Sequence, residues 1–198
     1  MTGRVSTPRR VIYLNQNGKD DTKMKISTRK LASAAVAGAA YAALTLLLAP
    51  ISFGLVQFRV SEALCILPAF ASCTAWGLWA GCAIANLAGG YGLPDIVFGS
   101  LATLGAALCM ARIAKGRRQP LSLGRAMAVC LMPVAWNGPI VGAVIAYSTG
   151  AFWTALPLNM VQIAAEEALV MYAVGLPLLK LLPKSTAFEQ AVEKLNMA

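Results

Sequence analysis

The chain contains no histidine and only eight acidic residues among 198. Without histidine a Ser-His-Asp triad cannot form. The five cysteines are odd in number, lie in apolar segments and include no CxxC pair, so neither a disulfide framework nor a zinc site is expected. No GxxxxGK[ST] loop occurs, so the chain has no recognisable ATP site. We expect no metal and no cofactor in this chain, and no nucleophile–base pair marks it as an enzyme.

Charged residues are also scarce. They make up 13% of the sequence, whereas a soluble domain carries about 25%. Hydrophobic residues make up 58%, and the mean hydropathy is +0.65. A transmembrane helix needs roughly 20 apolar residues, and the uncharged runs 31–49 and 126–149 supply that length. The composition therefore predicts an all-α integral membrane protein.

The net charge of +9 comes from basic residues that flank the apolar runs. Eight of the 17 Lys and Arg residues lie in 4–30, five in 112–125 and three in 180–194. Basic residues at the ends of apolar runs mark the cytoplasmic side of a membrane protein. We therefore do not expect nucleic acid as a partner.

The stretch 60–90 decides the number of membrane crossings, because it is long for one helix and short for two. If it crosses twice, with a break at 72–74, both termini and the basic residues of 112–125 lie on one side. This arrangement satisfies the positive-inside rule everywhere. The prediction is six transmembrane helices with a short second and third, cytoplasmic termini, and other helices at 31–49 (ended by Pro50), 95–112, 125–147 and 155–182.

Three parts of the chain follow from this reading. We predict a basic cytoplasmic tail (1–30), a six-helix membrane domain (31–183) and a short cytoplasmic C-terminal tail (184–198).

Polar side chains interrupt the apolar sequence at a few places. The octapeptide Gln57-Phe58-Arg59-Val60-Ser61-Glu62-Ala63-Leu64 lies between two apolar runs. A charge at mid-bilayer costs roughly 2.5–3.5 kcal/mol, so a charge kept at such a place is a candidate for function. Asp95, like Glu62, lies at the start of an apolar helix. The carboxylates of Glu62 and Asp95 could instead cap helix N-termini, and Arg59 could pair with Glu62 or share a ligand with it.

Glu166 and Glu167 lie deeper. Glu166 follows Pro157 by nine residues, which is about 13 Å at 1.5 Å per residue. Adjacent helix positions differ by about 100°, so only one glutamate can face a small interior ligand. Asn159 and Gln162 share a helix stripe with Glu166. The sequence leaves open which glutamate faces inward.

Two asparagines, Asn86 and Asn137, also lie in apolar runs. A buried Asn often bonds a neighbouring helix. Trp136 beside Asn137 adds an aromatic face, and amides with aromatic faces suit a planar, hydrogen-bonding heterocycle.

Small residues recur at every fourth position of the run 31–49. They form two series, Ala35, Ala39 and Ala43, and Ala34, Gly38 and Ala42. Such a face lets another helix approach closely, either inside the bundle or from a partner subunit.

Two long motifs, 47–54 (Leu47-Leu48-Ala49-Pro50-Ile51-Ser52-Phe53-Gly54) and the octapeptide 57–64, resemble the signature of the queuosine-precursor transporter family, QueT. Segments 84–87, 95–104, 167–168 and 175–179 are also similar, and the resemblance covers about 31–182. One departure is Glu166, where the family usually has glycine before the glutamate of the last helix.

This resemblance implies the substrate-binding S component of an energy-coupling factor (ECF) transporter, in a bacterial plasma membrane. It implies a 7-deazaguanine ligand, such as 7-aminomethyl-7-deazaguanine. It also implies three partner subunits: a transmembrane T component, met by the face of Ala35, Ala39 and Ala43, and two ATPases. With the polar inventory, it predicts a ligand site formed by Gln57, Arg59, Glu62, Asn86, Asp95, Trp136, Asn137, Gln162 and Glu167.

Other functions stay open at this point. The chain could be an S component for another vitamin or nucleobase, or a secondary transporter coupled to protons through Glu166 or Glu167. A purely structural role is disfavoured, because it would leave four carboxylates at or inside apolar helices unexplained.

Overall fold

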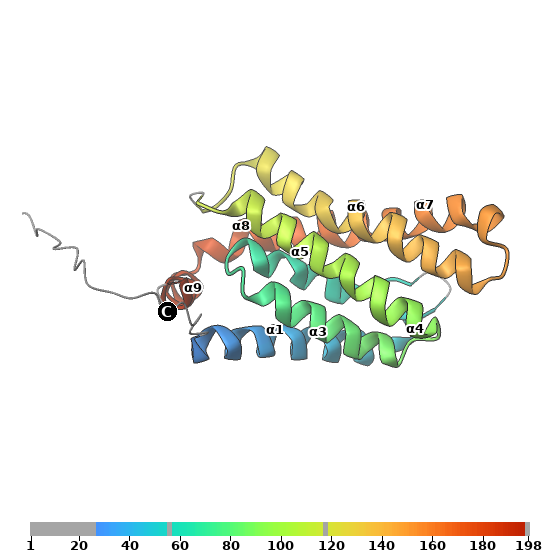
Figure 1. The fold of residues 1–198 in the computed structure, drawn as a ribbon. Coiled ribbons are helices and arrows are strands. Elements are labelled where there is room, and N and C mark those ends of the chain that lie inside the picture. Colours follow the sequence, from blue (N-terminus) through green and yellow to red (C-terminus); the bar gives the residue numbers. More distant parts are fainter. Residues whose placement is uncertain (1–26, 55–56, 117–118, 197–198) are drawn as a thin grey trace, which may run out of the picture.

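In the computed structural model, residues 27–54, 57–116 and 119–196 are described, and they form helices with no strand among them. The long helices run along a common axis in Figure 1: α1 (Thr28–Leu47), α3 (Thr74–Leu87), α5 (Ser100–Ala114), α6 (Leu123–Ser148) and α7 (Phe152–Val170). The shorter elements are α2 (Ala49–Ser52), the 3₁₀ helix η1 (Val60–Ala69), α4 (Gly92–Pro94), the π-turns η2 (Asp95–Gly99) and η3 (Met171–Gly175), α8 (Leu176–Leu181), the 3₁₀ turn η4 (Leu182–Lys184) and α9 (Thr186–Asn196).

Three helices of the described residues are long and apolar enough to cross a membrane. They are Thr28–Leu47, Gly92–Ala114 and Leu123–Ser148, with 20, 23 and 26 residues. At 1.5 Å per residue the shortest reaches about 30 Å, the thickness of a hydrocarbon core. The prediction of an all-helical, apolar protein is confirmed for the described residues. The count of six helices is not, because prolines and π-turns divide the chain into more segments than predicted.

The stretch 60–90 breaks where the charge pattern predicts. η1 ends at Ala69 and α3 begins at Thr74, with turn residues between them. A 3₁₀ helix rises about 2.0 Å per residue, so the ten residues of η1 cover about 20 Å, close to the length that α3 reaches with fourteen α-helical residues. The stretched geometry lets a short segment run alongside a longer one.

Glycines let α1 and α3 pack closely. A Cβ on Gly77 would collide with the carbonyl oxygen of Ala34, and one on Gly81 would lie 2.8 Å from the Cα of Gly38. The series that contains Ala34 and Gly38 therefore packs inside the bundle. The other series, Ala35, Ala39 and Ala43, stays exposed on the outside of α1.

The interior between the helices is apolar along most of its length. Fully buried side chains from five elements pack together there, with large contributions from Tyr41, Ile66, Leu78, Met110 and Met171. Close packing of this kind fixes the positions of the few polar side chains that share the interior.

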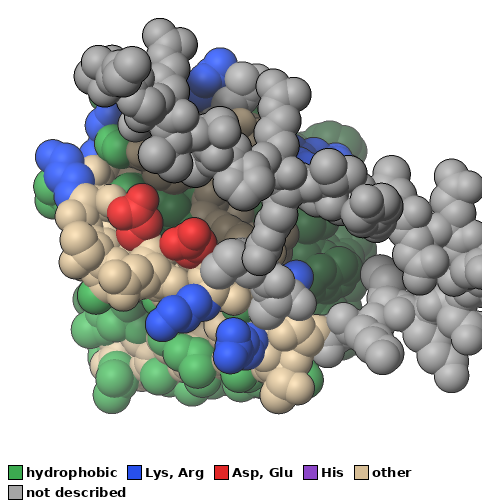
Figure 2. All heavy atoms as spheres, turned by 90° about the vertical axis from the view of Figure 1, so that its left-hand side faces the viewer, with side chains coloured by type: hydrophobic (Ala, Val, Ile, Leu, Met, Phe, Trp, Pro, Cys, Tyr) green, Lys and Arg blue, Asp and Glu red, His purple; other side chains and the backbone are tan. Residues whose placement is uncertain are grey.

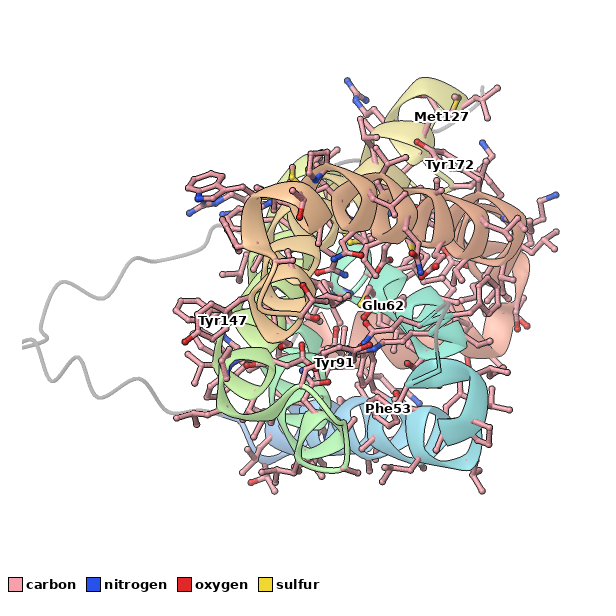
Figure 3. All side chains as sticks on the ribbon, turned by 90° about the vertical axis from the view of Figure 1, so that its right-hand side faces the viewer. Phe53, Glu62, Tyr91, Met127, Tyr147 and Tyr172 are labelled. Carbon is pink, nitrogen blue, oxygen red and sulfur yellow. The ribbon has the colours of Figure 1, made fainter. Side chains whose placement is uncertain are left out.

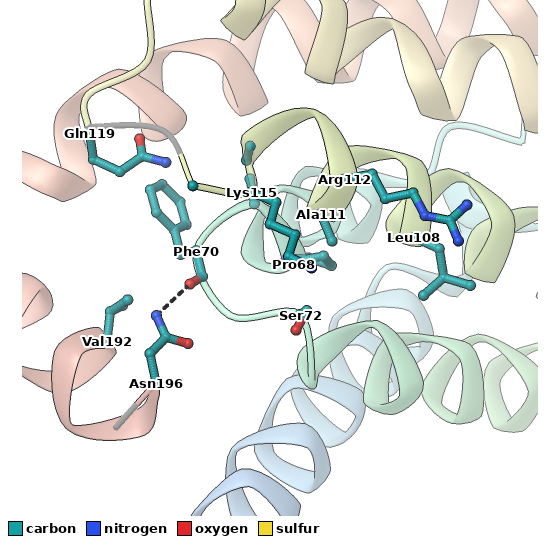
Figure 4. A pocket seen from close by; sticks show the side chains of 13 residues that line it. Pro68, Phe70, Ser72, Leu108, Ala111, Arg112, Lys115, Gln119, Val192 and Asn196 are labelled. Atoms are coloured by element: carbon teal, nitrogen blue, oxygen red, sulfur yellow. Dashed lines mark hydrogen bonds between the residues drawn. The ribbon is translucent and has the colours of Figure 1, made fainter. Parts of the chain in front are cut away.

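The segment 184–198, predicted only as a tail, contains an amphipathic helix. α9 is seen nearly end-on in Figure 1, so it lies across the ends of the other helices. The rings of Phe70 and Phe188 make an edge-to-face contact at 5.0 Å. The Asn196 amide donates to the carbonyl oxygen of Phe70 at 3.1 Å (Figure 4). These contacts hold α9 against the turn between η1 and α3.

The two ends of the bundle differ in charge. Every described Lys and Arg except Arg59 lies in α9 or near the helix ends beside it, and Figure 2 shows basic side chains gathered on this end. Most of the predicted N-terminal tail (1–26) and residues 117–118 of the basic loop lie outside the described residues.

Candidate ligand-binding site

A buried ion pair lies near the opposite end of the bundle. Arg59 precedes η1 and Asp95 opens η2, and their side chains are 8% and 1% exposed with 3.3 Å between Nη2 and Oδ2. The guanidinium carbon of Arg59 also lies 5.5 Å from the centre of the Phe53 ring. Arg59 therefore takes Asp95 as its ion-pair partner, not the nearby Glu62.

Asn86 and Gly99 fix Asp95 in place. The Asn86 amide donates to the backbone carbonyl of Asp95 at 2.9 Å. A Cβ on Gly99 would collide with Oδ1 of Asp95, so only glycine leaves room for this carboxylate. Both features belong to a π-turn, a local widening of a helix that often occurs at functional sites.

Glu62 is held by two donors deep in the bundle. Its side chain is 2% exposed. The Tyr41 hydroxyl donates to one carboxylate oxygen, and the Cys65 thiol donates to the other at 3.0 Å. Figure 3 shows Glu62 among the helices near the middle of the bundle. One turn along α1, Thr45 donates to the Ser61 hydroxyl at 2.6 Å.

A second polar pair joins α6 and α7. The Asn137 amide donates to Glu167 Oε1 at 2.6 Å, and both side chains are almost fully buried. Glu166 is half-exposed as a residue, although its carboxylate oxygens are buried, and it interacts with Gln162 one turn earlier on α7. Glu167 is thus the inward-facing glutamate of the adjacent pair, a choice that the sequence leaves open.

The Asn137–Glu167 pair belongs to the same electrostatic cluster as Glu62 and the Arg59–Asp95 ion pair. Glu167 of α7 lies close enough to Glu62 and Arg59 for their charges to interact, although it is more than 100 residues away from both in the sequence. We call Arg59, Glu62, Asp95, Asn137 and Glu167 the polar cluster. These five residues are linked by one ion pair, one hydrogen bond and the interaction of their charges. The prediction that they form a ligand site stays a prediction.

Several buried polar atoms at this cluster have no hydrogen-bond partner. Leaving such an atom unpaired costs about 1–3 kcal/mol, so each calls for an explanation. A bound polar ligand would supply the missing partners. In the cluster itself the atoms are Nε of Arg59, Oδ1 of Asp95, Oδ1 of Asn137 and Oε2 of Glu167. Oδ1 of Asn86, whose amide nitrogen bonds Asp95, and both amide atoms of Gln57, two residues before Arg59, are also buried without a partner.

Gln57 is unusual in its backbone as well as its side chain. Its φ is 45°, the left-handed region that residues other than glycine seldom adopt, and its side chain is 5% exposed. Strain of this kind persists where the surroundings enforce it, often at ligand sites.

Three predicted site residues have other roles or places in the structure. Trp136 is 37% exposed, and its ring covers Gly105 of α5, so it points away from Asn137. Asn86 donates from its amide nitrogen to Asp95 and Cys82, and its amide oxygen is buried without a partner. Gln162 interacts with Glu166, its neighbour one turn later on α7.

Tyr41, Thr45, Ser61 and Cys65 were not predicted as site residues. Tyr41 and Thr45 are separated by one helical turn inside the Ala-rich run of α1. This spacing of two hydroxyls in an apolar helix is a signal that the sequence offers.

An apolar helical bundle that buries charged and amide side chains near one end is typical of a membrane transporter. A model of the QueT transporter family matches residues 31–184, which is most of the chain, and the chain therefore belongs to this family. No curated protein and no solved structure gives a significant match.

Proposed function

We propose that this transporter chain is the substrate-binding S component of an ECF-type importer and captures a queuosine precursor, a 7-deazaguanine such as 7-aminomethyl-7-deazaguanine. The observation that carries the proposal is the set of unpaired, nearly buried polar atoms at the polar cluster. Membership of the QueT family supports a transport role.

The chemistry of a 7-deazaguanine matches these atoms. Its guanine-like edge offers adjacent N–H donors, which a carboxylate accepts in a two-point contact. Glu167 and its hydrogen-bond partner Asn137 each have one free oxygen, and both atoms are acceptors. The ligand carbonyl needs a donor, which Arg59 Nε or the Gln57 amide supplies. The cationic aminomethyl group needs a second carboxylate, and Asp95 Oδ1 is free.

In this proposal, capture of the ligand and its transport across the membrane are carried out by different chains. This chain binds the ligand from outside, at the end of the bundle away from its basic residues. In the proposed ECF-type importer, two partner ATPases hydrolyse ATP, and a transmembrane T component couples them to the movement of the loaded chain; these partners are implied by the resemblance to S components. The exposed face of Ala35, Ala39 and Ala43 is the proposed contact with the T component.

Six crossings of a bacterial plasma membrane, with both termini in the cytoplasm, complete the proposal. The support is the position of the basic residues at one end of the bundle, which the positive-inside rule assigns to the cytoplasm.

The test is ligand binding to the purified chain, measured as thermal stabilisation and by calorimetry. The panel is 7-aminomethyl-7-deazaguanine, 7-cyano-7-deazaguanine, guanine and B vitamins. We expect the 7-deazaguanines to bind most tightly. Glu167→Gln should weaken binding roughly 10- to 150-fold, because a hydrogen bond to a charged group contributes about 1.5–3 kcal/mol.

Glu166→Gln is the matched control, because it makes the same change at the neighbouring, half-exposed position. It should bind as the parent chain does. Equal affinity in the parent and Glu167→Gln would refute the proposed site. Preference for a B vitamin or for guanine would keep the S-component function and refute the substrate.

A further inference from the structure

Two adjoining hollows lie between the first turns of α1 and the amphipathic helix α9. The outer hollow has a volume of about 300 Å³ and the inner one about 380 Å³. Together they form one groove at the basic end of the bundle. The two hollows share four lining residues, Ala32, Ser33, Ala191 and Leu195.

The outer hollow is basic. Arg29 of α1 and Lys194 of α9 line it, and neither makes an ion pair with any described residue. The acidic residues of α9, Glu189 and Glu193, lie two positions before and after Ala191. At about 100° per residue they face away from the groove, and both are exposed. The mouth of the groove is thus positively charged.

The inner hollow is apolar. Apart from Ser33 and Thr74 its lining is hydrophobic, and the Thr74 hydroxyl already donates to the Ala71 carbonyl. Val36, Ala40 and Leu67 line it on the side of the bundle, and Phe188 and Val192 close it from α9. A groove with this lining suits a hydrocarbon chain and offers few partners to water.

A different hollow at the same end shows that basic side chains alone do not indicate a binding site for an anion. Arg112 and Lys115 line a hollow of about 500 Å³ between α5 and α9 (Figure 4). They lie at the C-terminal end of α5, where a helix dipole stabilises cations without any ligand. Arg29 lies in the first turn of α1, where the dipole gives a cation no such stabilisation.

We propose that the groove between α1 and α9 binds one anionic phospholipid of the cytoplasmic leaflet. Its phosphate lies between Arg29 and Lys194, and one acyl chain lies along Val36 and Ala40. The inference rests on the proposed orientation, which puts the basic end at the level of the lipid headgroups. Basic pockets beside transmembrane helices on the cytoplasmic side recognise such headgroups.

The experiment is native mass spectrometry of the full chain in detergent, titrated with phosphatidylglycerol, phosphatidylcholine of the same acyl length, and glycerol 3-phosphate. We expect one phosphatidylglycerol to bind in preference to phosphatidylcholine. Arg29→Gln with Lys194→Gln should weaken that binding about 30-fold, the factor that two interfacial cations supply at their usual strength.

Arg125→Gln with Lys184→Gln is the matched control, because it removes two exposed cations at the same end but outside the groove. It should retain the lipid. Ala32→Trp fills both hollows without a change of charge and should also prevent binding.

Three outcomes would overturn the proposal. They are equal retention of phosphatidylglycerol in the two double variants, equal binding of phosphatidylcholine, and binding of glycerol 3-phosphate as tight as that of the lipid. The last would indicate a site for a free phosphate. Binding of a 7-deazaguanine is measured separately, so either inference can fail without the other.

Discussion

The ion pair between Arg59 and Asp95 gives a sharp prediction about stability. Removal of one partner of a buried pair costs about 3–5 kcal/mol, because the other charge is left without compensation. Replacement of both removes the charges together and costs less than the sum. We therefore expect the single variants Arg59→Gln and Asp95→Asn to be less stable than the parent chain, and their double variant to show strong coupling.

The surroundings of the ion pair determine which of the two single variants loses more stability. In Asp95→Asn, the guanidinium keeps the Phe53 ring at 5.5 Å and the nearby charge of Glu62, so the loss should be about 3 kcal/mol. In Arg59→Gln, Asp95 and Glu62 lose the cation that both face, so the loss should be about 5 kcal/mol. The double variant should lose at least about 2 kcal/mol less than the sum of both.

The assay is reversible unfolding in mixed micelles with a rising fraction of sodium dodecyl sulfate, in the absence of ligand. Phe53→Leu is a control that removes the ring contact and leaves the ion pair. Additive losses in the double variant would refute the reasoning, and so would a larger loss in Asp95→Asn than in Arg59→Gln.

Four further predictions use other parts of the structure. Gly77→Ala should destabilise the chain by about 1–3 kcal/mol in the same unfolding assay, because its Cβ meets the α1 backbone, whereas Gly124→Ala, with no heavy atom within 4 Å of its Cβ, should not. Glu62→Gln should weaken 7-deazaguanine binding in calorimetry less than Glu167→Gln does, because Tyr41 and Cys65 already occupy both of its oxygens; an equal loss would assign Glu62 a direct contact. Trp136→Leu should leave ligand affinity unchanged, because the ring covers Gly105. A membrane-impermeant maleimide should modify Cys73, the half-exposed thiol in the turn before α3, in inside-out but not in right-side-out vesicles; the reverse pattern would invert the proposed topology.

The arrangement of the helices was predictable to the extent that charge and length determine it. The break between η1 and α3 was predictable from the distribution of basic residues, because the predicted double crossing, which would keep them on one side, requires such a break. The 3₁₀ form of η1 was not predictable, since its ten residues and Pro68 are equally compatible with a loop. α9 was missed because its apolar residues are few and its stability depends on contacts with Phe70.

The members of the polar cluster were predictable, but their pairing was not. Charges and amides in apolar runs are costly, so the sequence marks Arg59, Asp95 and Glu167 as unusual. Arg59 lies three residues from Glu62 and 36 from Asp95, and yet it pairs with Asp95. Trp136 and Asn137 are neighbours on a helix and differ by about 100°, so their adjacency in the sequence does not reveal that the Trp136 ring lies over Gly105.

The pattern of used and unused atoms separates groups that hold a site from groups that contact a ligand. Asn137, Glu167, Arg59 and Asp95 each use one polar atom in a bond to another side chain and leave a second atom without a partner. The bond fixes the orientation of each side chain, so a ligand that binds the free atom would cost little conformational entropy. Glu62 has no free oxygen, so it is one of the groups that hold the site and not one that contacts the ligand.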